Sequence, residues 1–437
     1  MNAYHCKPAG GPLDATIRVP GSKSITNRAL VLASLADGTS ILSNVLLADD
    51  TRLMVDALRA LGITITIDEE TGTAEITGCG GQIPHSQAGL PCGNSGTTMR
   101  FLTALCALGH GRYELDGVER MRQRPIGQLA EVLAALGAGI DYPMNSGCPP
   151  ITIHARGLSG GHVGFHDAPS SQMISALLMA APYATGDVLI DVTGRVISRP
   201  YLTMTTAMMD AFGVGVLQQF GAPTAQSAKF IVAPQRYQAQ NFAIEPDASN
   251  AAYFLAAAAI AGGTVTVTGL CPASIQGDAQ FVDVLQQMGC RVDRAPHHLA
   301  LTGPARSEGL QGIDVDLNDM PDMVQTLAVT ALFAQSPTTI RNVASLRVKE
   351  TDRLTALQNE LTKLGATVTT TGDGLSLAPP QQIQPATIKT YNDHRMAMSF
   401  ALAGLRGADV TIQNPDCCRK TFPQFFDHFE SLGRSAV

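Results

Sequence analysis

The stretch that decides the fold is Val19-Pro20-Gly21-Ser22-Lys23-Ser24-Ile25-Thr26-Asn27-Arg28, which continues into the apolar run Ala-Leu-Val-Leu-Ala-Ser-Leu-Ala. A β-branched run ends at a Pro-Gly turn, and a polar cluster then opens a helix. Ser22, Lys23 and Ser24 therefore fall at a helix N-terminus, where unpaired backbone N–H groups and the helix dipole favour an anion. Taken alone, this pattern is equally typical of a helix cap beside two surface cations, Lys23 and Arg28.

The same order of short strand, turn, polar cluster and small apolar helix recurs along the whole chain. Successive clusters are 71 to 78 residues apart, and six clusters at a period of about 75 residues indicate an internal repeat. The clusters are marked by Ser24, Ser95, Ser171, Ser249, Asp322 and His394.

A second marker, in phase with the first, is a helix that ends at a glycine. Such a glycine is expected at the C′ position of the helix, where positive φ is common. The six glycines are Gly62, Gly137, Gly213, Gly289, Gly365 and Gly433. The agreement of the two markers predicts six βαβαββ units.

The ends of the chain indicate how the units group into domains. We expect a strand at Thr16–Val19 to open the first unit, and the sixth unit lacks its closing hairpin. Because unpaired sheet edges are costly, the N-terminal segment is expected to complete the last sheet. The predicted domains are residues 21–240 and residues 1–20 plus 241–437, with the active site in the cleft between them.

Composition narrows the class of protein. The 437 residues carry a net charge of −7, which argues against a nucleic-acid surface. The nine cysteines show no spacing typical of a disulfide framework, and no signal-peptide pattern or membrane-spanning stretch is found. We therefore expect a cytoplasmic protein that binds neither nucleic acid nor membrane.

The polar clusters carry the chemistry. If the six helices point toward one cleft, their N-termini and seven cations form a site for small, highly anionic substrates. These cations are Lys23, Arg28, Arg124, Lys349, Arg353, Arg395 and Lys420. Candidate acid–base groups are Asp322, Glu350 and His394, which suit addition to an activated double bond. The simpler alternatives are a helix cap for Asp322, a surface pair of Glu350 with Arg353, and a buried structural histidine for His394.

Other motifs are incomplete. Gly21-Ser22-Lys23-Ser24 lacks the first glycine of a phosphate-binding P-loop, and no G-x-G-x-x-G opens a helix after a strand. The histidines and cysteines show no spacing typical of a metal site. We therefore expect no metal and no cofactor.

The chain resembles the 5-enolpyruvylshikimate-3-phosphate synthase family of enolpyruvyl transferases along its whole length. The resemblance rests on segments 20–24, 27–28, 93–97, 124–125, 170–172, 347–353, 392–395 and 420–423. It implies two inside-out α/β domains of three βαβαββ units each. It also implies transfer of the enolpyruvyl group of phosphoenolpyruvate to the 5-hydroxyl of shikimate 3-phosphate, by addition and elimination through a tetrahedral intermediate. The expected form is a monomer.

The resemblance also assigns residues to substrates. Shikimate 3-phosphate would be held by Lys23, Ser24, Arg28, Ser170, Ser171, Gln172, Ser198, Tyr201, Asp322 and Lys349. Phosphoenolpyruvate would be held by Lys23, Asn94, Gly96, Arg124, Gln172, Arg353, Arg395 and Lys420. The catalytic residues would be Asp322, which accepts the 5-hydroxyl proton, Glu350 with Lys23, which handle protonation of the methylene carbon, and His394.

Two positions depart from the usual pattern of the family, and two alternative functions have to be considered. Ser345-Leu346 stands where many family members carry Asn-Trp. Phe101 follows Arg100, at a position where many family members carry proline. The related transferase that acts on UDP-N-acetylglucosamine carries Asn after its first Lys and a reactive cysteine. Here Ser24 follows Lys23, and residues 109–123 contain no cysteine. A non-catalytic anion-binding scaffold would be expected to lose Lys23, Asp322 or Glu350, and all three are present.

Overall fold

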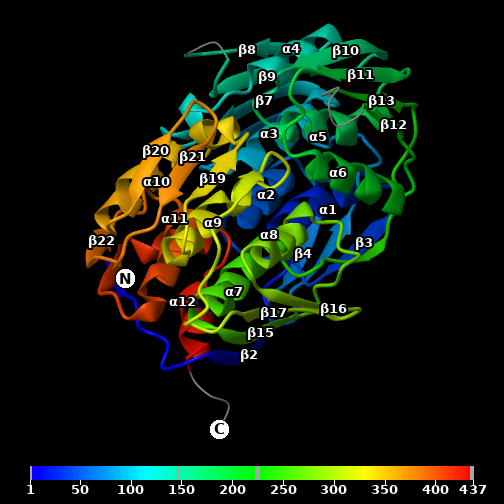
Figure 1. The fold of residues 1–437 in the computed structure, drawn as a ribbon. Coiled ribbons are helices and arrows are strands. Elements are labelled where there is room, and N and C mark those ends of the chain that lie inside the picture. The colour runs from blue at the N-terminus through cyan, green and yellow to red at the C-terminus, as the bar shows by residue number, and fades with distance from the viewer. Residues whose placement is uncertain (1, 145–146, 222–226, 434–437) are drawn as a thin grey trace. The chain divides into compact units, whose positions relative to one another are not determined.

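The structure, a computed structural model, describes residues 2–144, 147–221 and 227–433. The chain forms two compact units (Figure 1). Unit 1 comprises Met1–Pro20 and Glu245–Val437, and unit 2 comprises Gly21–Ile244. Helices and strands alternate in both units, so the predicted α/β class is confirmed. None of the described helices combines the length and apolar character needed to cross a membrane.

The described strands of unit 2 form three four-stranded sheets. The first contains, in spatial order, β14 (Asn241–Ala243), β3 (Thr39–Ser43), β5 (Thr73–Thr77) and β4 (Thr64–Asp68). The second contains β6 (Gln87–Pro91), β7 (His110–Asp116), β9 (Ile151–Arg156) and β8 (Gly139–Asp141). The third contains β10 (Gly161–His166), β11 (Val188–Thr193), β13 (Ala228–Val232) and β12 (Leu217–Phe220).

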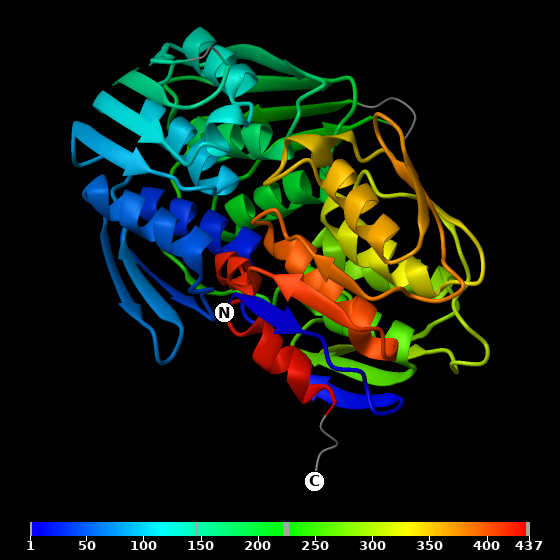
Figure 2. The same cartoon turned by 90° about the vertical axis from the view of Figure 1, so that its left-hand side faces the viewer.

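The helices of unit 2 lie against these sheets, as α1 and α2 do beside the blue strands β3, β4 and β5 in Figure 2. The α-helices are α1 (Lys23–Leu35), α2 (Asp49–Ala60), α3 (Gly96–Ala107), α4 (Gly127–Ala135), α5 (Ser171–Ala180) and α6 (Arg199–Ala211). Two 3₁₀ turns are η1 (Met121–Gln123) and η2 (Ala181–Tyr183). All residues of α3 are buried, whereas residues of β13 alternate between buried and exposed. The helices therefore form the interior of this unit, and each sheet keeps an outer face toward solvent.

Unit 1 has two four-stranded sheets and one three-stranded sheet among its described residues. The first contains β16 (Arg291–Ala295), β17 (His298–Gly303), β15 (Gly263–Thr268) and β2 (Leu13–Ile17). The second contains β18 (Asp314–Asp316), β19 (Thr338–Arg341), β21 (Leu375–Ala378) and β20 (Thr367–Thr370). The three-stranded sheet contains β1 (Ala3–His5), β23 (Val410–Gln413) and β22 (Ala386–Ile388).

The helices of unit 1 surround a fully buried, alanine-rich centre. The α-helices are α7 (Ala248–Ala261), α8 (Phe281–Gln287), α9 (Val324–Thr330), α10 (Arg353–Lys363), α11 (His394–Ala401) and α12 (Phe425–Ser431). The 3₁₀ turns are η3 (Gly277–Gln280), η4 (Pro321–Met323), η5 (Ala331–Phe333), η6 (Ala344–Val348), η7 (Leu402–Arg406) and η8 (Pro415–Lys420). Every residue of α7 is buried, because alanine side chains let α9, η7 and the strands β15 and β17 approach it closely.

Every four-stranded sheet has one parallel pair followed by two antiparallel pairs, which is the pattern that a βαβαββ unit produces. In two of these sheets the first strand comes from a distant part of the chain. Strand β2 is parallel to β15, and β14 is parallel to β3. The prediction that the strand near Thr16–Val19 opens the first unit is therefore wrong, because β14 takes that position.

The pairing of β14 also places residues 241–243 in unit 2, whereas the sequence predicts residue 241 as the start of the other domain. At the opposite end, β1 is antiparallel to β23, so the N-terminal segment completes the last sheet. Both chain crossings between the units fall next to extended backbone, at Pro20 and at Ile244. Local sequence patterns specify that these segments are strands, but only tertiary packing selects the sheet that each joins.

The helix ends follow the predicted capping logic. The N-cap side chains of Ser95, Ser170, Asp247, Asp352 and Asp393 each accept a hydrogen bond from a backbone N–H of their helix. Five of the six marker glycines have positive φ: Gly62, Gly137, Gly213, Gly289 and Gly365. The prediction is wrong for Gly433, which follows the end of α12 and lacks positive φ.

Gly21 stands at one of the crossings and permits a close backbone approach. A Cβ atom at this position would lie 1.9 Å from the carbonyl oxygen of Asn44. We therefore expect Gly21→Ala to lower the free energy of unfolding by about 2 kcal/mol, because a backbone carbonyl has to move. The matched control is Gly10→Ala, since no atom lies within 4 Å of a Cβ at that position. Thermal unfolding of both variants measures the effect, and equal melting temperatures would show that the contact relaxes without cost.

Candidate functional site

The predicted site residues fall into two clusters, one in each unit. The Lys23 half-site belongs to unit 2 and comprises Lys23, Ser24, Arg28, Asn94, Gly96, Arg124, Ser170, Ser171, Gln172, Ser198 and Tyr201. The Asp322 half-site belongs to unit 1 and comprises Asp322, Lys349, Glu350, Arg353, His394, Arg395 and Lys420.

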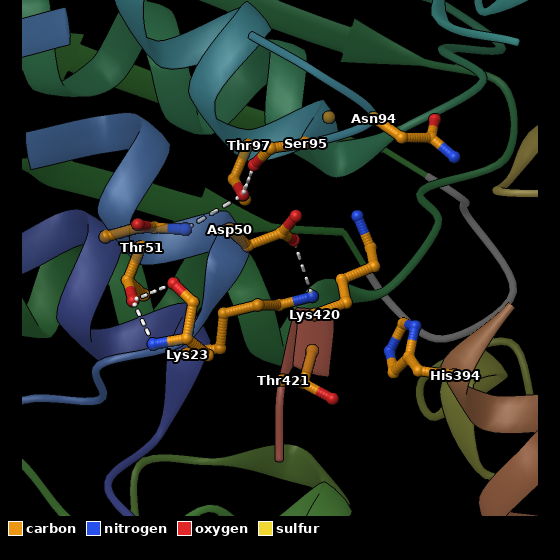
Figure 3. A network of polar contacts seen from close by, with 12 residues as sticks. Lys23, Asp50, Thr51, Asn94, Ser95, Thr97, His394, Lys420 and Thr421 are labelled. Carbon is orange, nitrogen blue, oxygen red and sulfur yellow. Dashed lines mark hydrogen bonds and ion pairs between the residues drawn. The ribbon is translucent and has the colours of Figure 1, made fainter. Parts of the chain in front are cut away.

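Lys23 is the first residue of α1, as the anion-site pattern predicts. Its ammonium nitrogen lies 3.4 Å from Oδ2 of Asp50, in the first turn of α2 (Figure 3). The Asp50 side chain is 4% exposed, so this carboxylate is held against Lys23 largely away from water. Sequence reasoning missed Asp50, because an acidic residue in the first turn of a helix is already explained by the helix dipole.

The segment around α3 holds Arg124. Its Nη1 donates to the carbonyl oxygen of Asn94 at 2.9 Å and to the side-chain oxygen at 3.2 Å. Gly96 opens α3, and a Cβ there would lie 2.6 Å from Nη2 of Arg124. The glycine therefore leaves room for a guanidinium that is 3% exposed. The Nε atom of Arg124 is buried, and no described residue provides it with a hydrogen-bond acceptor.

Arg100 connects three of the predicted elements, and only its position in a predicted helix was visible in the sequence. Its Nη1 donates to Oε1 of Gln172 at 2.9 Å, and its Nη2 donates to the carbonyl oxygen of Pro125 at 2.8 Å. Gln172 lies in the first turn of α5, whose N-cap Ser170 accepts from the Gln172 N–H. Arg100 thus fixes α5 relative to the segment that carries Arg124.

The start of α6 contributes Ser198 and Tyr201. Ser198 is the N-cap and has a left-handed backbone with φ of 54°, which is uncommon for a residue with a side chain. Tyr201 lies in the first turn, and its ring faces the guanidinium of Arg28 at 5.8 Å. Arg28 itself is 1% exposed and belongs to the centre of α1. The structure therefore brings Tyr201 to Arg28, and Ser198 lies three residues earlier, where its carbonyl oxygen accepts from the Tyr201 N–H.

In unit 1, the carboxylate of Asp322 is surrounded by cations. Oδ1 lies 3.0 Å from Nη1 of Arg353 and 3.6 Å from the Lys349 ammonium, and Oδ2 lies 2.8 Å from Nη2 of Arg395. Burial opposes ionisation, but Arg395, Lys349 and Arg353 hold the pKa of Asp322 well below its usual range. Asp322 lies in η4 and makes no capping hydrogen bond, so the helix-cap alternative is wrong.

Arg353 is the most connected residue of this half-site. Its guanidinium forms a fork on Asp393, with Nε 2.8 Å from Oδ2 and Nη2 3.2 Å from Oδ1. Nη2 also lies 3.0 Å from Oε2 of Glu350. Although burial disfavours its charge, Asp393, Glu350 and Asp322 raise the pKa of Arg353 above its ordinary value. Because both side chains are nearly inaccessible, the alternative of a surface pair between Glu350 and Arg353 is wrong.

Asp393 is the structural residue of this cluster that sequence reasoning did not select. It is inaccessible to solvent, binds Arg353 and accepts a hydrogen bond from the Arg395 backbone N–H as the N-cap of α11. Its place one residue before His394 in an Asn-Asp-His-Arg run was an available capping signal. His394 is 1% exposed, and its Nδ1 lies 3.6 Å from Oδ1 of Asp393.

The outer members of the cluster are Arg395 and Lys420. Nη1 of Arg395 donates to the hydroxyl oxygen of Tyr253, a fully buried residue of α7, at 3.3 Å. Lys420 ends η8, and its ammonium lies 3.8 Å from Oε1 of Glu350. All the predicted charged residues of unit 1 therefore lie in one connected cluster, which combines an ionised carboxylate with forked donors for phosphate or carboxylate oxygens.

Known proteins match this chain over nearly its full length. The model of the family EPSP synthase (3-phosphoshikimate 1-carboxyvinyltransferase) matches residues 8–429. The 3-phosphoshikimate 1-carboxyvinyltransferase of Nostoc punctiforme is 49% identical, and the aligned region spans 98% of this chain and 99% of that enzyme. The chloroplastic enzyme of that name from Arabidopsis thaliana is 46% identical and covers 96% of this chain and 82% of its own.

Solved structures agree with this assignment. The EPSP synthase of Acinetobacter baumannii superposes with a TM-score of 0.81 at 26% identity and covers 99% of this chain and 98% of its own. The enolpyruvyl transferase NikO of Streptomyces tendae has a TM-score of 0.78 at 16% identity, a likeness of fold alone, and covers 99% of this chain and 98% of its own. The resemblance seen in the sequence is confirmed, and the chain belongs to the EPSP synthase family.

Proposed function

We propose that this chain is a transferase that moves the enolpyruvyl group of phosphoenolpyruvate to the 5-hydroxyl of shikimate 3-phosphate and releases phosphate. Family membership over residues 8–429 supports this reaction. The single observation that carries it is the Asp322 carboxylate, which lies within 4 Å of three cations. An ionised carboxylate among donors for anions can accept the hydroxyl proton during addition to phosphoenolpyruvate.

In this proposal the two half-sites bind the substrates together, in a cleft between the units. Shikimate 3-phosphate contacts Lys23, Ser24, Arg28, Ser170, Ser171, Gln172, Ser198, Tyr201, Asp322 and Lys349. Phosphoenolpyruvate contacts Lys23, Asn94, Gly96, Arg124, Gln172, Arg353, Arg395 and Lys420. Buried guanidinium groups and helix N-termini support both assignments, because they stabilise phosphate and carboxylate oxygens.

The reaction follows as an addition and an elimination. Asp322 accepts the 5-hydroxyl proton while the oxygen bonds to C2 of phosphoenolpyruvate, and Glu350 with Lys23 delivers a proton to C3. In the tetrahedral intermediate C3 is a methyl group. This methyl group then returns a proton to the Glu350 region, the C2–C3 double bond forms again, and the C2–O bond to phosphate breaks. His394, next to Asp393, completes the proposed catalytic set. The protein acts without metal or cofactor, and we expect a monomer in the cytoplasm.

The direct test is phosphate release from phosphoenolpyruvate with two alternative co-substrates. We expect release with shikimate 3-phosphate and none with UDP-N-acetylglucosamine, because Ser24 follows Lys23 and residues 109–123 contain no cysteine. Release with the UDP-sugar alone would assign the chain to the rival reaction. No release with either would favour a non-catalytic anion-binding protein.

Asp322→Asn should separate binding from catalysis. The amide keeps the size of the side chain but cannot accept the hydroxyl proton, so kcat should fall by about 10²–10⁴. The Kd for shikimate 3-phosphate, measured by calorimetry, should change by less than about tenfold, or roughly 1.4 kcal/mol. The matched control is Asp314→Asn, which removes a carboxylate paired with Arg341 at the surface of the same unit. Normal turnover of Asp322→Asn would move the base to Glu350 or His394.

The pH dependence of the wild-type enzyme gives a second check on Asp322. Its pKa lies well below the usual range, so the carboxylate stays ionised as the pH falls from 8 to about 5. The logarithm of kcat should therefore show no acidic limb from this group in that interval. An acidic limb present in wild type and absent from the residual activity of Asp322→Asn would contradict the assignment.

Arg124→Ala should raise the KM for phosphoenolpyruvate by about tenfold to a hundredfold, since a charge-assisted contact contributes about 1.5–3 kcal/mol. The KM for shikimate 3-phosphate should change far less. Arg122→Ala is the matched control, because this neighbouring arginine pairs with Asp116 at the surface. If both KM values rise equally in Arg124→Ala, the residue does not belong to the phosphoenolpyruvate pocket.

A further inference from the structure

A strained turn lies directly before Asp393, the N-cap of α11. Tyr391 and Asn392 both have a left-handed backbone, with φ of 54° and 55°. The N–H of Asp393 donates to the carbonyl oxygen of Thr390 at 2.9 Å and closes the turn. Two successive positive φ values are typical of a type I′ turn, which favours asparagine and glycine because they adopt this backbone at low cost. An aromatic residue at the first central position is unusual, so contacts elsewhere must hold the turn in this shape.

A buried carboxylate on α10 holds this turn from one side. The hydroxyl of Tyr391 donates to Oε1 of Glu360 at 2.8 Å, and the backbone N–H of Lys389 donates to Oε2 at 3.0 Å. Glu360 is 1% exposed, and the hydroxyl of Tyr391 also accepts from Nδ2 of Asn359 at 3.4 Å. Both oxygens of one inaccessible carboxylate therefore hold the segment that leads into the turn.

The charge of Glu360 is compensated within the same helix. The ammonium of Lys363 lies 2.6 Å from Oε2, and the ammonium of Lys389 lies 5.1 Å from the centroid of the Tyr391 ring. A buried carboxylate is costly unless it is paired and hydrogen-bonded, and here both conditions are met. The ionised side chain can therefore act as a fixed acceptor for Tyr391 and Lys389 without taking a cation from the Asp322 half-site.

Arg353 holds the other end of the turn from the same helix. Its guanidinium forms the fork on Asp393, and Asp393 accepts from the backbone N–H of Arg395 at 3.0 Å. Arg353 and Glu360 are separated by about two helical turns, so both side chains extend from one face of α10. The turn is thus fixed between two contacts with α10, and the segment that follows it carries His394 and Arg395.

We propose that Glu360 and Tyr391 are positioning residues that hold this turn in its left-handed shape and thereby place Asp393. In the proposed function, on which this inference rests, Arg353 and Arg395 bind phosphoenolpyruvate. Without the hydroxyl contact, the turn can relax toward the ordinary negative φ. Asp393 would then shift against Arg353, and Arg395 would shift with the helix start that Asp393 caps.

Steady-state kinetics and calorimetry of Tyr391→Phe test the proposal, because this variant keeps the ring and removes only the hydroxyl. We expect the KM for phosphoenolpyruvate to rise by about tenfold, since a displaced guanidinium weakens a charge-assisted contact. The Kd for shikimate 3-phosphate should change by less than about twofold. The matched control is Tyr113→Phe, which removes a hydroxyl that donates to the carbonyl oxygen of His85 at 2.9 Å in unit 2. Both constants should change by less than about twofold in the control.

Two kinetic outcomes would overturn the proposal. If kcat of Tyr391→Phe falls while neither constant changes, the variant has only lost folded protein. If both constants rise equally, the turn does not place the phosphoenolpyruvate contacts in particular.

A double-mutant cycle tests whether the two residues act as a pair. Glu360→Gln replaces one of the two acceptor oxygens by an amide nitrogen and should also raise the KM for phosphoenolpyruvate. In that background, Tyr391→Phe should change this KM by less than about twofold. A further tenfold rise would contradict the proposal, because the hydroxyl would then act without Glu360. Melting temperatures show whether each variant is folded, and Tyr391→Phe decides the proposal if Glu360→Gln does not fold.

A further readout needs neither substrate nor turnover. In the ligand-free protein, the backbone N–H groups of Asp393 and Arg395 are held by the turn and by the N-cap. Hydrogen exchange, followed by NMR, should be about tenfold faster at both groups in Tyr391→Phe and unchanged in Tyr113→Phe. Unchanged exchange in folded Tyr391→Phe would overturn the proposal. Faster exchange in a protein that never turns over shikimate 3-phosphate would support the positioning role and place the failure in the proposed function.

Discussion

The buried guanidinium of Arg353 is the interaction on which the geometry of the unit 1 half-site depends. It binds Asp322, Glu350 and Asp393, which come from three different segments of the chain. Because Arg353 is 1% exposed, the loss of any one partner leaves charge in a place where water cannot compensate it. The same carboxylates also position the other cations: Asp322 binds Lys349 and Arg395, and Glu350 lies near Lys420.

The two units use opposite solutions to the problem of buried charge. In unit 1, three carboxylates accompany four cations, so an ionised base is available at a site that still attracts anions. In unit 2, Lys23 has Asp50 beside it, whereas Arg28 and Arg124 are held by neutral groups in the described part of the chain. In the proposed function, this arrangement lets a protein with a net charge of −7 attract anionic substrates locally.

Features that depend on local sequence patterns, such as helix starts and helix ends, could be predicted. The recurrence of polar clusters located Ser95, Ser171 and Asp322 at helix starts or turns, because a capping side chain must precede its helix by a fixed number of residues. The glycine markers predicted positive φ correctly at five helix ends and failed at Gly433. The α/β class followed from the same periodicity.

The remaining features depend on contacts between segments far apart in the chain. The exchange of β2 and β14 between sheets could not be predicted, since both short strands carry the same local signal and tertiary packing selects their partners. Likewise, Phe101 was visible only as a departure from the family pattern. Its contact with Arg28 depends on the approach of α1 to α3, which sets the ring centroid 5.2 Å from Cζ of Arg28. Asp50 and Asp393 were already explained as helix-start residues, which concealed their salt bridges.

A crystal structure of the protein with shikimate 3-phosphate tests the central proposal most directly, namely that the ionised carboxylate of Asp322 is poised for the 5-hydroxyl. The proposal predicts that the 5-hydroxyl lies within hydrogen-bond distance of the Asp322 carboxylate. A bound substrate whose 5-hydroxyl lies away from Asp322 would contradict it.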